Sequence, residues 1–414
     1  MQALLGIAVL IGIAWICSQD RRRIPWKVVG IGLLMQCALA LILLRAPMVG
    51  DALLVLNSLV SAVERATSAG AGFVFGYLAG GAQPFNVSDP QGLYLFAFRV
   101  LPQIIVFSVL VALLWYWRIL PAVIKLFGRI LHRSLGVSGP VGTAAASSVF
   151  LGMVETPLVV RGYLQSLSRS EMFTLMTCGM STVAGSIMVL YAGVLSDVIP
   201  GALGHILIAS VINVVGAIYV SRIMIPPADE ASAKVVDSDL RYSSNMDAIT
   251  RGTSDGLRLA VNVGAMLVVL VSLVALVNNA LGALPMDGGP VTLERIMGWI
   301  FSPVAWLIGI PWAEAETAGA LLGAKLILNE LVAYLNLAAL PVDALSKESE
   351  LILMYALCGF ANFGSLGILL GGLGTLVPER RTEILSTAPW TLVSGTLVGN
   401  ITGAIVGLVT ATSS

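Results

Sequence analysis

Long apolar runs, separated by short polar segments, dominate this chain. A helix that crosses a bilayer needs about 20 mostly apolar residues. Eight runs approach or exceed that length, so the pattern predicts an all-α polytopic membrane protein with eight transmembrane helices. The charges beside the first run, Arg21 to Lys27, follow its apolar core, which indicates a span and not a cleaved signal peptide. The runs are 3–17, 28–46, 100–117, 172–195, 203–226, 259–283, 351–374 and 388–411.

Two further apolar stretches are interrupted by residues that break helices or carry charge. Residues 136–160 contain several Gly, Pro and Ser together with Glu155, and residues 306–341 contain Glu330 among other polar residues. Non-helical backbone at membrane depth is tolerated only where protein buries it or a water-filled cavity faces it. We therefore predict two opposed re-entrant hairpins, the first entering from the cytoplasm and the second from the outer side.

The basic residues predict the orientation. With the N-terminus outside, most of the 23 basic residues fall in segments on the cytoplasmic side, as the positive-inside rule requires. Both termini are then expected on the outer face. The amphipathic segments 118–133 and 50–68 are expected at the inner and outer interfaces, respectively. Segment 227–257, rich in Asp and Ser, is interpreted as a flexible cytoplasmic linker.

The two halves of the chain repeat one order of elements. Each hairpin is followed by a span with a polar break, at 181–186 and at 361–365, and then by an intact span. This is the pattern of an inverted repeat, in which broken helices bind substrate near the bilayer midplane. We predict scaffold and transport subdomains. The divisions are N-terminal scaffold spans and interfacial helices (1–134), a first transport repeat (135–226), a linker with span six and an interfacial helix (227–305), and a second transport repeat (306–414).

Composition narrows the function classes. Hydrophobic residues make up 57% of the 414 residues and charged residues 11%. Soluble domains carry roughly 25% charged residues, so a soluble enzyme or a nucleic-acid-binding protein is excluded. The four cysteines show no metal-binding spacing and the two histidines lie far apart in the sequence. Neither a zinc site nor a histidine-based catalytic site is therefore expected, and an intramembrane enzyme is only a remote alternative.

Two carboxylates lie where a membrane tolerates them poorly. A charged side chain at the bilayer centre costs at least about 2.5–3.5 kcal/mol, so Glu155 and Glu330 are functional candidates. The alternative is that both only accept hydrogen bonds from hairpin amides. Glu314 and Glu316 are interpreted as structural or gating residues. Lys325 is expected to stabilise its hairpin or to extend toward the interface.

Several motifs in the second half resemble those of the concentrative nucleoside transporter family. They are Pro311–Glu316 (PWAEAE), Ala318–Gly323 (AGALLG), Leu328–Tyr334 (LNELVAY) and Cys358–Ser365 (CGFANFGS). The resemblance implies a homotrimer in the cytoplasmic (inner) membrane of a bacterium that imports nucleosides together with a cation. It implies no cofactor and no nucleic-acid partner.

The resemblance also implies a set of substrate-binding residues. Glu330 matches the family residue that contacts ribose hydroxyls, and Asn362 and Ser365 match residues that face the nucleoside. The first hairpin departs from the family's usual Gly-Gln-Thr-Glu, because Met153 and Val154 replace the residues that bond the nucleobase edge. Base choice is therefore expected to be broader or shifted. The full candidate set is Gly152, Met153, Val154, Glu155, Ile187, Glu330, Phe360, Asn362 and Ser365.

The cation site that the resemblance implies is altered. Ser148 stands where sodium-coupled relatives have an Asn, while Thr182 keeps a hydroxyl and the carbonyls of Leu151 and Val183 remain available. A hard cation prefers several oxygen ligands, so a weakened Na⁺ site is expected at these four residues. Glu155 is alternatively a proton carrier. The substitution favours H⁺ slightly over Na⁺, and both remain open.

The resulting hypothesis is a cation-coupled nucleoside symporter that works by alternating access. Two alternatives within transport remain. One is a transporter of another polar metabolite, such as a modified nucleoside or a carboxylate. The other is a passive channel, which two opposed hairpins disfavour because they suggest an occluded site.

Overall fold

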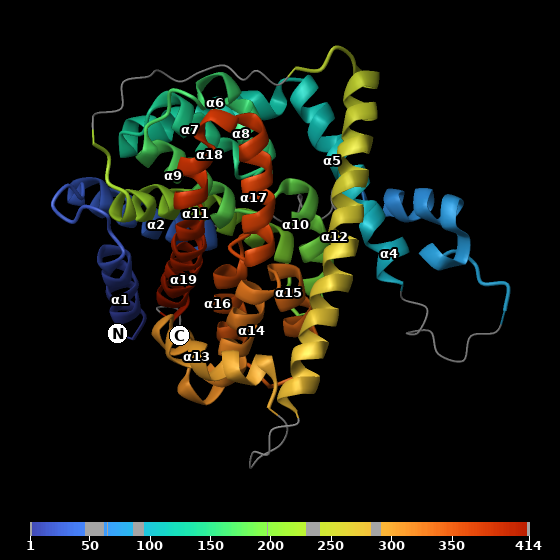
Figure 1. Ribbon diagram of the computed structural model, residues 1–414. Coiled ribbons are helices and arrows are strands. Elements are labelled where there is room, and N and C mark those ends of the chain that lie inside the picture. The colour runs from blue at the N-terminus through green and yellow to red at the C-terminus, as the bar shows by residue number, and fades with distance from the viewer. Residues whose placement is uncertain are drawn as a thin grey trace.

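The computed structural model describes residues 2–45, 62–63, 65–85, 95–196, 198–228, 241–282 and 291–411, and within these ranges it contains helices and turns but no strand. Figure 1 shows the helices packed around a central group that includes α11, α16 and α19. Most of the segment 50–68, expected at the outer interface, lies outside the described residues. Within the described residues, all eight predicted apolar runs are largely helical, although some are broken.

Four helices among the described residues are long and apolar enough to cross a membrane. Shorter apolar helices include α1 (Gln2–Ile16) and parts of α12 and α17. Helix length alone therefore supports a membrane protein but does not yield the predicted count of eight spans. The four long helices are α2 (Trp26–Arg45), α4 and α5 together (Phe96–Arg99 and Leu101–Tyr116), α11 (Ala202–Met224) and α19 (Pro389–Ala411).

Both predicted helix breaks are present. The first separates α9 (Arg169–Ser181) from α10 (Gly185–Leu195), as expected. The second separates α16 (Lys347–Leu357) from α17 (Phe363–Leu376), so it falls at 358–362 and not at the predicted 361–365. The second break ends earlier than predicted for a local reason. Asn362 is the N-cap of α17, accepting a hydrogen bond from the Ser365 backbone N–H at 2.7 Å, which lets the helix begin directly after it.

The two predicted hairpins form short helix–turn–helix pairs. The first joins α7 (Gly139–Ser147) to α8 (Glu155–Val159), and the second joins α14 (Ala315–Ile327) to α15 (Glu330–Ala338). Figure 1 shows the first pair near one end of the molecule and the second toward the other end. The second hairpin begins later than the predicted residue 306. Trp306 and Leu307 belong to the preceding α13 (Leu293–Leu307).

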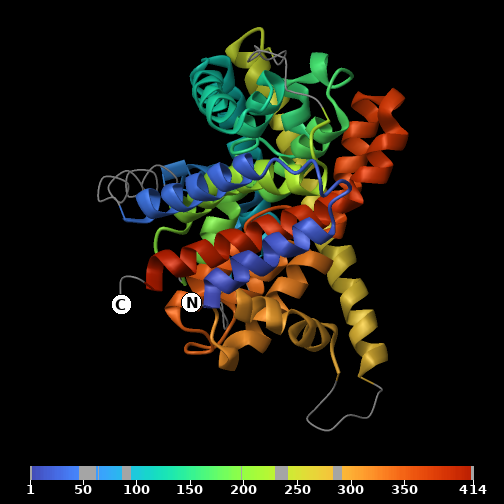
Figure 2. The same ribbon diagram turned by 90° about the vertical axis from the view of Figure 1, so that its left-hand side faces the viewer.

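The linker prediction over 227–257 was too long. α12 (Asn245–Leu281) begins inside it, because Ser244 accepts a hydrogen bond from the Asp247 backbone N–H at 3.1 Å and thereby caps the helix. α12 packs along α5, and Figures 1 and 2 show it running past one side of the molecule. The amphipathic segment 118–133 is confirmed as a helix, α6 (Ile119–Leu135).

The intact helices of the two repeats form the centre of the fold. α11 and α19 pack on each other. α9 packs on α11, and α16 packs on α19. α2 packs on α11, and α1 packs on α19, as Figure 2 shows for the latter pair. The first two helices, grouped with the scaffold by the sequence analysis, thus contact the repeats directly. The remaining short elements are η1 (Gly76–Ala79), η3 (Arg161–Tyr163), η4 (Trp312–Glu314), η5 (Pro378–Arg380) and α18 (Arg381–Thr387).

Candidate substrate site

A cavity of about 370 Å³ opens between the two hairpins, the two broken helices and one face of α12. Its wall is more apolar than polar by residue type, with a few polar side chains at the helix breaks. Such a mixture is typical of small-molecule sites. The structure brings together on this wall all nine residues that the sequence analysis proposed for substrate binding: Gly152, Met153, Val154, Glu155, Ile187, Glu330, Phe360, Asn362 and Ser365.

Glu330 is the most constrained carboxylate of the cavity. It begins α15 directly after the cap residue Asn329, where the helix N-terminus favours a negative charge. Its Oε1 accepts a hydrogen bond from the Tyr191 hydroxyl at 2.5 Å, and its Oε2 accepts one from Asn362 Nδ2 at 2.8 Å. Only 4% of the residue is exposed. Because an ionised carboxylate offers about four acceptor positions, these two side-chain donors leave acceptor capacity for hydroxyl donors of a ligand.

Asn362 links this carboxylate to the second helix break. Its Oδ1 accepts the Ser365 backbone N–H at 2.7 Å while its Nδ2 donates to Glu330. Both ends of the amide are therefore used, which fixes the orientation of the side chain. Phe360 and Ser365 are buried on either side of it. The break thus presents an aromatic ring, an amide and a hydroxyl next to one carboxylate.

Glu155 lines the same cavity from the first hairpin, at the start of α8. Its Oε2 accepts the Gly152 backbone N–H at 2.9 Å, which closes the hairpin turn. Glu155 and Asp255 of α12 also line a second, smaller cavity of about 70 Å³. Tyr242 contributes to this smaller cavity. Burial raises the pKa of Tyr242 to about 12, with the Asp255 and Glu155 carboxylates adding to the shift, so its phenol keeps its proton.

The side of the cavity expected to face the nucleobase is largely apolar on the hairpin. Met153 packs near Gly179, and Val154 packs near Gly372. Polar groups come instead from α12, where Asp255, Arg258 and Asn262 line the cavity. Their spacing of three and four residues places them on one helical face. A polar stripe at that spacing, running into a predicted span, was the signal that could have identified them.

Tyr191 was also missed by the sequence analysis. It lies one helical turn after Ile187 on α10, and both residues line the cavity. The spacing from Ile187 to Tyr191 was the available signal, since residues four apart share one face of a helix. Its ring packs against that of Tyr334, with the centroids 5.1 Å apart. The ring contact holds the hydroxyl in position for Glu330.

The four residues proposed for a cation lie at the contact between the first hairpin and the first break. Gly185 N–H donates to the Phe150 carbonyl at 2.8 Å, which joins the two segments. Ser148 Oγ donates to the Ala145 carbonyl and Thr182 Oγ1 to the Cys178 carbonyl. Their protons are thus engaged, and the oxygen lone pairs remain for a cation. These two hydroxyls, with the carbonyls of Leu151 and Val183, fit a hard cation as neutral oxygen ligands.

Two charged side chains of the second hairpin have structural contacts. Lys325 is buried, and its Nζ donates to the Ala356 carbonyl at 2.9 Å, which supports the hairpin-stabilising interpretation. Glu314 accepts hydrogen bonds from the backbone N–H and the hydroxyl of Ser346, each at 3.2 Å. It therefore holds the segment that precedes α16.

The fold contains two repeats of hairpin, broken helix and intact helix, and their hairpins and broken helices line one cavity that has polar side chains at the helix breaks. This arrangement defines a secondary membrane transporter. The comparisons with known proteins agree with that class. Residues 205–407 match the family described as Na⁺ dependent nucleoside transporter C-terminus, and residues 5–78 match its N-terminal counterpart. Residues 97–197 match the family described as nucleoside recognition. The chain belongs to the concentrative nucleoside transporter family, whose members are transporters and not enzymes.

Individual relatives match along nearly the whole chain. The nucleoside permease NupC of Helicobacter pylori is 36% identical over 98% of this chain and 97% of its own length. The transporter YutK of Bacillus subtilis is 38% identical, with 98% of each chain covered. Among solved structures, CNTnw in an inward-facing substrate-bound state is 35% identical, with a TM-score of 0.91 over 100% of this chain and 98% of that one. The shared architecture therefore extends over both repeats.

Proposed function

We propose that this protein is a cation-coupled symporter that imports nucleosides across a bacterial inner membrane by alternating access. The observation that carries the proposal is the buried Glu330 carboxylate, oriented by Tyr191 and Asn362 at the edge of the cavity. Membership of the family supports the nucleoside as substrate class. In the proposed architecture, eight spans and two re-entrant hairpins enclose the site.

In this proposal the ribose lies against the second hairpin. Vicinal hydroxyls donate to the remaining acceptor capacity of the Glu330 carboxylate, and Asn362 and Ser365 complete the polar side. The carboxylate is held on both oxygens before the ligand arrives. A preorganised acceptor loses less side-chain entropy on binding, which favours affinity.

The base lies against the first hairpin and Phe360. Since Met153 and Val154 offer no strong hydrogen-bond donor or acceptor, the hairpin selects mainly by shape and stacking. An apolar wall discriminates less sharply among bases than one with polar partners. We therefore expect purine and pyrimidine nucleosides to compete with one another more evenly than in a relative with polar residues at these positions.

The coupling cation is H⁺ or Na⁺. For Na⁺, the ligands would be the hydroxyls of Ser148 and Thr182 and the carbonyls of Leu151 and Val183. For H⁺, the carrier would be Glu155, which lies between the large cavity and the smaller cavity that contains Asp255. Either site lies on the first repeat, whereas the ribose residues lie on the second.

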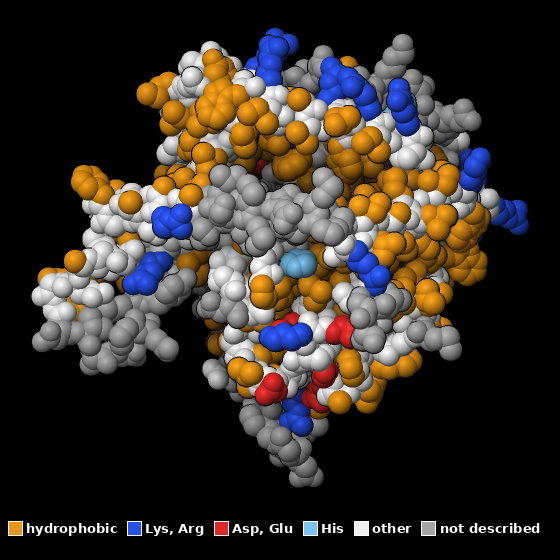
Figure 3. Space-filling view, turned by 180° about the vertical axis from the view of Figure 1, so that it is seen from behind, with side chains coloured by type: hydrophobic (Ala, Val, Ile, Leu, Met, Phe, Trp, Pro, Cys, Tyr) orange, Lys and Arg blue, Asp and Glu red, His pale blue; other side chains and the backbone are white. Residues whose placement is uncertain are grey.

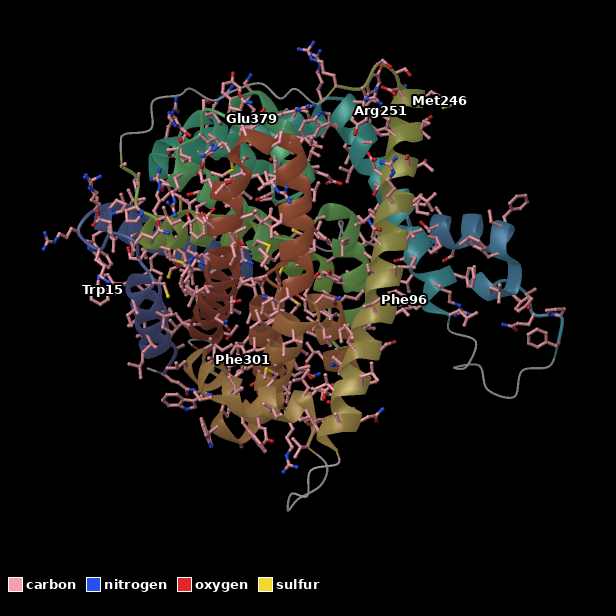
Figure 4. All side chains as sticks on the ribbon, in the orientation of Figure 1. Trp15, Phe96, Met246, Arg251, Phe301 and Glu379 are labelled. Carbon is pink, nitrogen blue, oxygen red and sulfur yellow. The ribbon has the colours of Figure 1, made fainter. Side chains whose placement is uncertain are left out.

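We further propose a homotrimer in which the α5–α12 pair forms the stationary scaffold. α12 exposes a row of apolar side chains, among them Val261, Val268 and Leu276, which a neighbouring copy or lipid would cover. Figure 3 shows Lys and Arg gathered at the end where α6 lies, and a group of Asp and Glu toward the opposite end. Figure 4 places Met246 and Arg251 at the same end as Glu379. Under the positive-inside rule that end is cytoplasmic, with both termini outside.

The test is uptake of labelled nucleosides into proteoliposomes while the Na⁺ and H⁺ gradients are varied separately. Symport predicts accumulation above equilibrium with one inward gradient and collapse when a matching ionophore dissipates it. Uptake that responds to neither gradient would exclude symport. Competition by unlabelled nucleosides and by dicarboxylates distinguishes the substrate classes, and inhibition by dicarboxylates alone would exclude nucleosides.

A further inference from the structure

A buried chain of hydrogen bonds runs from α2 to both helix breaks. The Tyr219 hydroxyl donates to Gln36 Oε1 at 2.6 Å, and Gln36 Nε2 donates to Thr402 Oγ1 at 2.9 Å. The Thr402 hydroxyl donates to Asn213 Oδ1 at 2.6 Å. Finally, Asn213 Nδ2 donates to two carbonyls, that of Ser181 at 2.8 Å and that of Cys358 at 3.0 Å.

Both carbonyls lose their helical partner at a helix break. In a continuous helix the Ser181 carbonyl would accept the Gly185 N–H, but that group donates to Phe150 instead. The Cys358 carbonyl would accept the Asn362 N–H, which donates to the Phe360 carbonyl. A buried carbonyl without a partner is costly. The carboxamide of Asn213 therefore replaces one lost helical hydrogen bond in each repeat.

The two breaks are in direct contact at this point. Gly359 has φ of 134°, and a Cβ at this position would lie 2.7 Å from the Ser181 carbonyl oxygen. Glycine is thus needed for the backbones to approach this closely. On α11, a Cβ at Gly216 would lie 3.0 Å from Gln36 Nε2, so the absence of a side chain there makes room for the amide.

The direction of every hydrogen bond in this chain is determined. With the Asn213 amide reversed, its oxygen would face two carbonyl oxygens, and the Thr402 hydroxyl would lose its acceptor. Asn213, Thr402, Gln36 and Tyr219 are all completely buried. Apolar residues at these four positions would leave the Ser181 and Cys358 carbonyls without this donor, so the polar chain orients the two breaks in addition to filling space.

We propose that Asn213 is a positioning residue that couples cation binding to nucleoside binding. The proposal rests on the proposed symport function. Ser181 directly precedes Thr182 and Val183 at the cation candidate, whereas Cys358 lies two residues before Phe360 and four before Asn362 in the nucleoside site. One amide thereby fixes the backbone of both sites relative to each other. A displacement at the first break therefore reaches the second through this side chain as well as through the close contact at Gly359.

The first test measures nucleoside affinity with and without the coupling cation. In the wild type, the ratio of the two dissociation constants is the coupling factor. In Asn213→Leu the factor falls toward one, and affinity with the cation present falls by about tenfold or more, as expected for lost buried hydrogen bonds. A folded Asn213→Leu variant with the wild-type coupling factor would overturn the proposal.

A matched substitution separates this role from simple loss of polarity. Thr174→Val removes another buried link between α9 and α11, the 2.9 Å contact of Thr174 Oγ1 with Ser221 Oγ, without touching either break. Its coupling factor stays at the wild-type value. If Asn213→Leu does not fold, two substitutions of Thr402 replace it. Thr402→Val removes the hydroxyl that donates to the Asn213 oxygen and leaves the Asn213 side chain in place. Thr402→Ser keeps that hydroxyl. Loss of coupling in the first and its retention in the second supports the proposal; wild-type coupling in both overturns it.

A second readout does not depend on transport. Cys358 is a buried free thiol at the second break, and its carbonyl is held by Asn213. With Cys17, Cys37 and Cys178 replaced by Ala, labelling by a small maleimide reports on that break alone. Asn213→Leu or Thr402→Val raises the labelling rate by about tenfold, and Thr174→Val leaves it unchanged. An unchanged rate in both test variants would contradict positioning.

These readouts also separate the two proposals. If the wild type binds no nucleoside, or binds it without regard to either cation, the proposed function and the coupling role both fail. The Cys358 labelling rate then still decides whether Asn213 positions the breaks. If coupling is present but insensitive to Asn213 and Thr402, only the inference about Asn213 is wrong.

Discussion

Replacing Glu330 by Gln tests the ribose assignment with little disturbance of the fold. The carboxylate accepts from Tyr191 at 2.5 Å and from Asn362 at 2.8 Å. Glutamine keeps one oxygen for Asn362, and its NH₂ can donate to the Tyr191 oxygen once that hydroxyl rotates. Both neighbours therefore keep a partner, and the main change is the loss of the negative charge.

The expected loss of affinity follows from the number of ribose hydroxyls that donate to the carboxylate. A hydrogen bond to a charged group contributes about 1.5–3 kcal/mol, compared with about 0.5–1.5 kcal/mol for a neutral pair. The difference is about 1 kcal/mol for each hydroxyl. Two hydroxyls give about 2 kcal/mol, which corresponds to roughly a 30-fold rise in the nucleoside dissociation constant.

The assay is a binding titration of purified protein with a ribonucleoside and with its 2′,3′-dideoxy analogue. The dideoxy analogue lacks both donors, so its affinity is nearly the same for the wild type and Glu330→Gln. An equal loss for both ligands would refute contact with the ribose hydroxyls. Glu350→Gln is the control, because Glu350 is paired with the exposed Lys347 at 2.9 Å, outside the cavity, and such pairs contribute little.

Three further substitutions test other parts of the site. Tyr191→Phe removes one of the two donors that orient Glu330 and weakens nucleoside binding about fivefold in the same titration; wild-type affinity would exclude an orienting role. Ser148→Asn restores an amide oxygen at the cation candidate and lowers the Na⁺ concentration that gives half-maximal uptake; no change would argue for H⁺ coupling through Glu155. Gly359→Ala places a Cβ 2.7 Å from the Ser181 oxygen and lowers the melting temperature by an amount equivalent to about 2 kcal/mol, whereas Gly367→Ala, which meets no atom within 4 Å, does not. Equal melting temperatures for the two glycine variants would refute the close contact.

The repeat and its two breaks could be predicted because they leave strong local signals. Uninterrupted apolar runs predict helices, and runs that contain Gly, Ser, Asn and Glu at membrane depth predict breaks. The second break was placed three residues too late because capping decided its end: Asn362 begins α17 as its N-cap, so the residues after it are already helical. Likewise, Ser244 starts α12 within a segment whose composition suggested a linker.

Local patterns could not show that α11 and α12 reach the site, although the polar stripe on α12 was visible in the sequence. Asn213 is one of several polar residues in a mostly apolar span, and its importance depends on two carbonyls far away in the sequence. Asp255, Arg258 and Asn262 belong to a helix that reaches the cavity from outside both repeats. Long-range packing brings these groups to the site, and a single sequence contains no direct record of it.

The end of α16 shows why breaking a helix inside a membrane requires additional polar residues. The last carbonyls of the helix have no donor within the helix, and water is not available there to donate to them. Three side chains from other elements donate instead: Tyr334 to the Met354 carbonyl at 3.0 Å, Lys325 to that of Ala356 at 2.9 Å, and Asn213 to that of Cys358 at 3.0 Å. The Lys325 ammonium also complements the partial negative charge at a helix C-terminus. The buried lysine is therefore accounted for by the helix break itself, which leaves Glu330 and Glu155 as the charged hairpin residues that line the cavity.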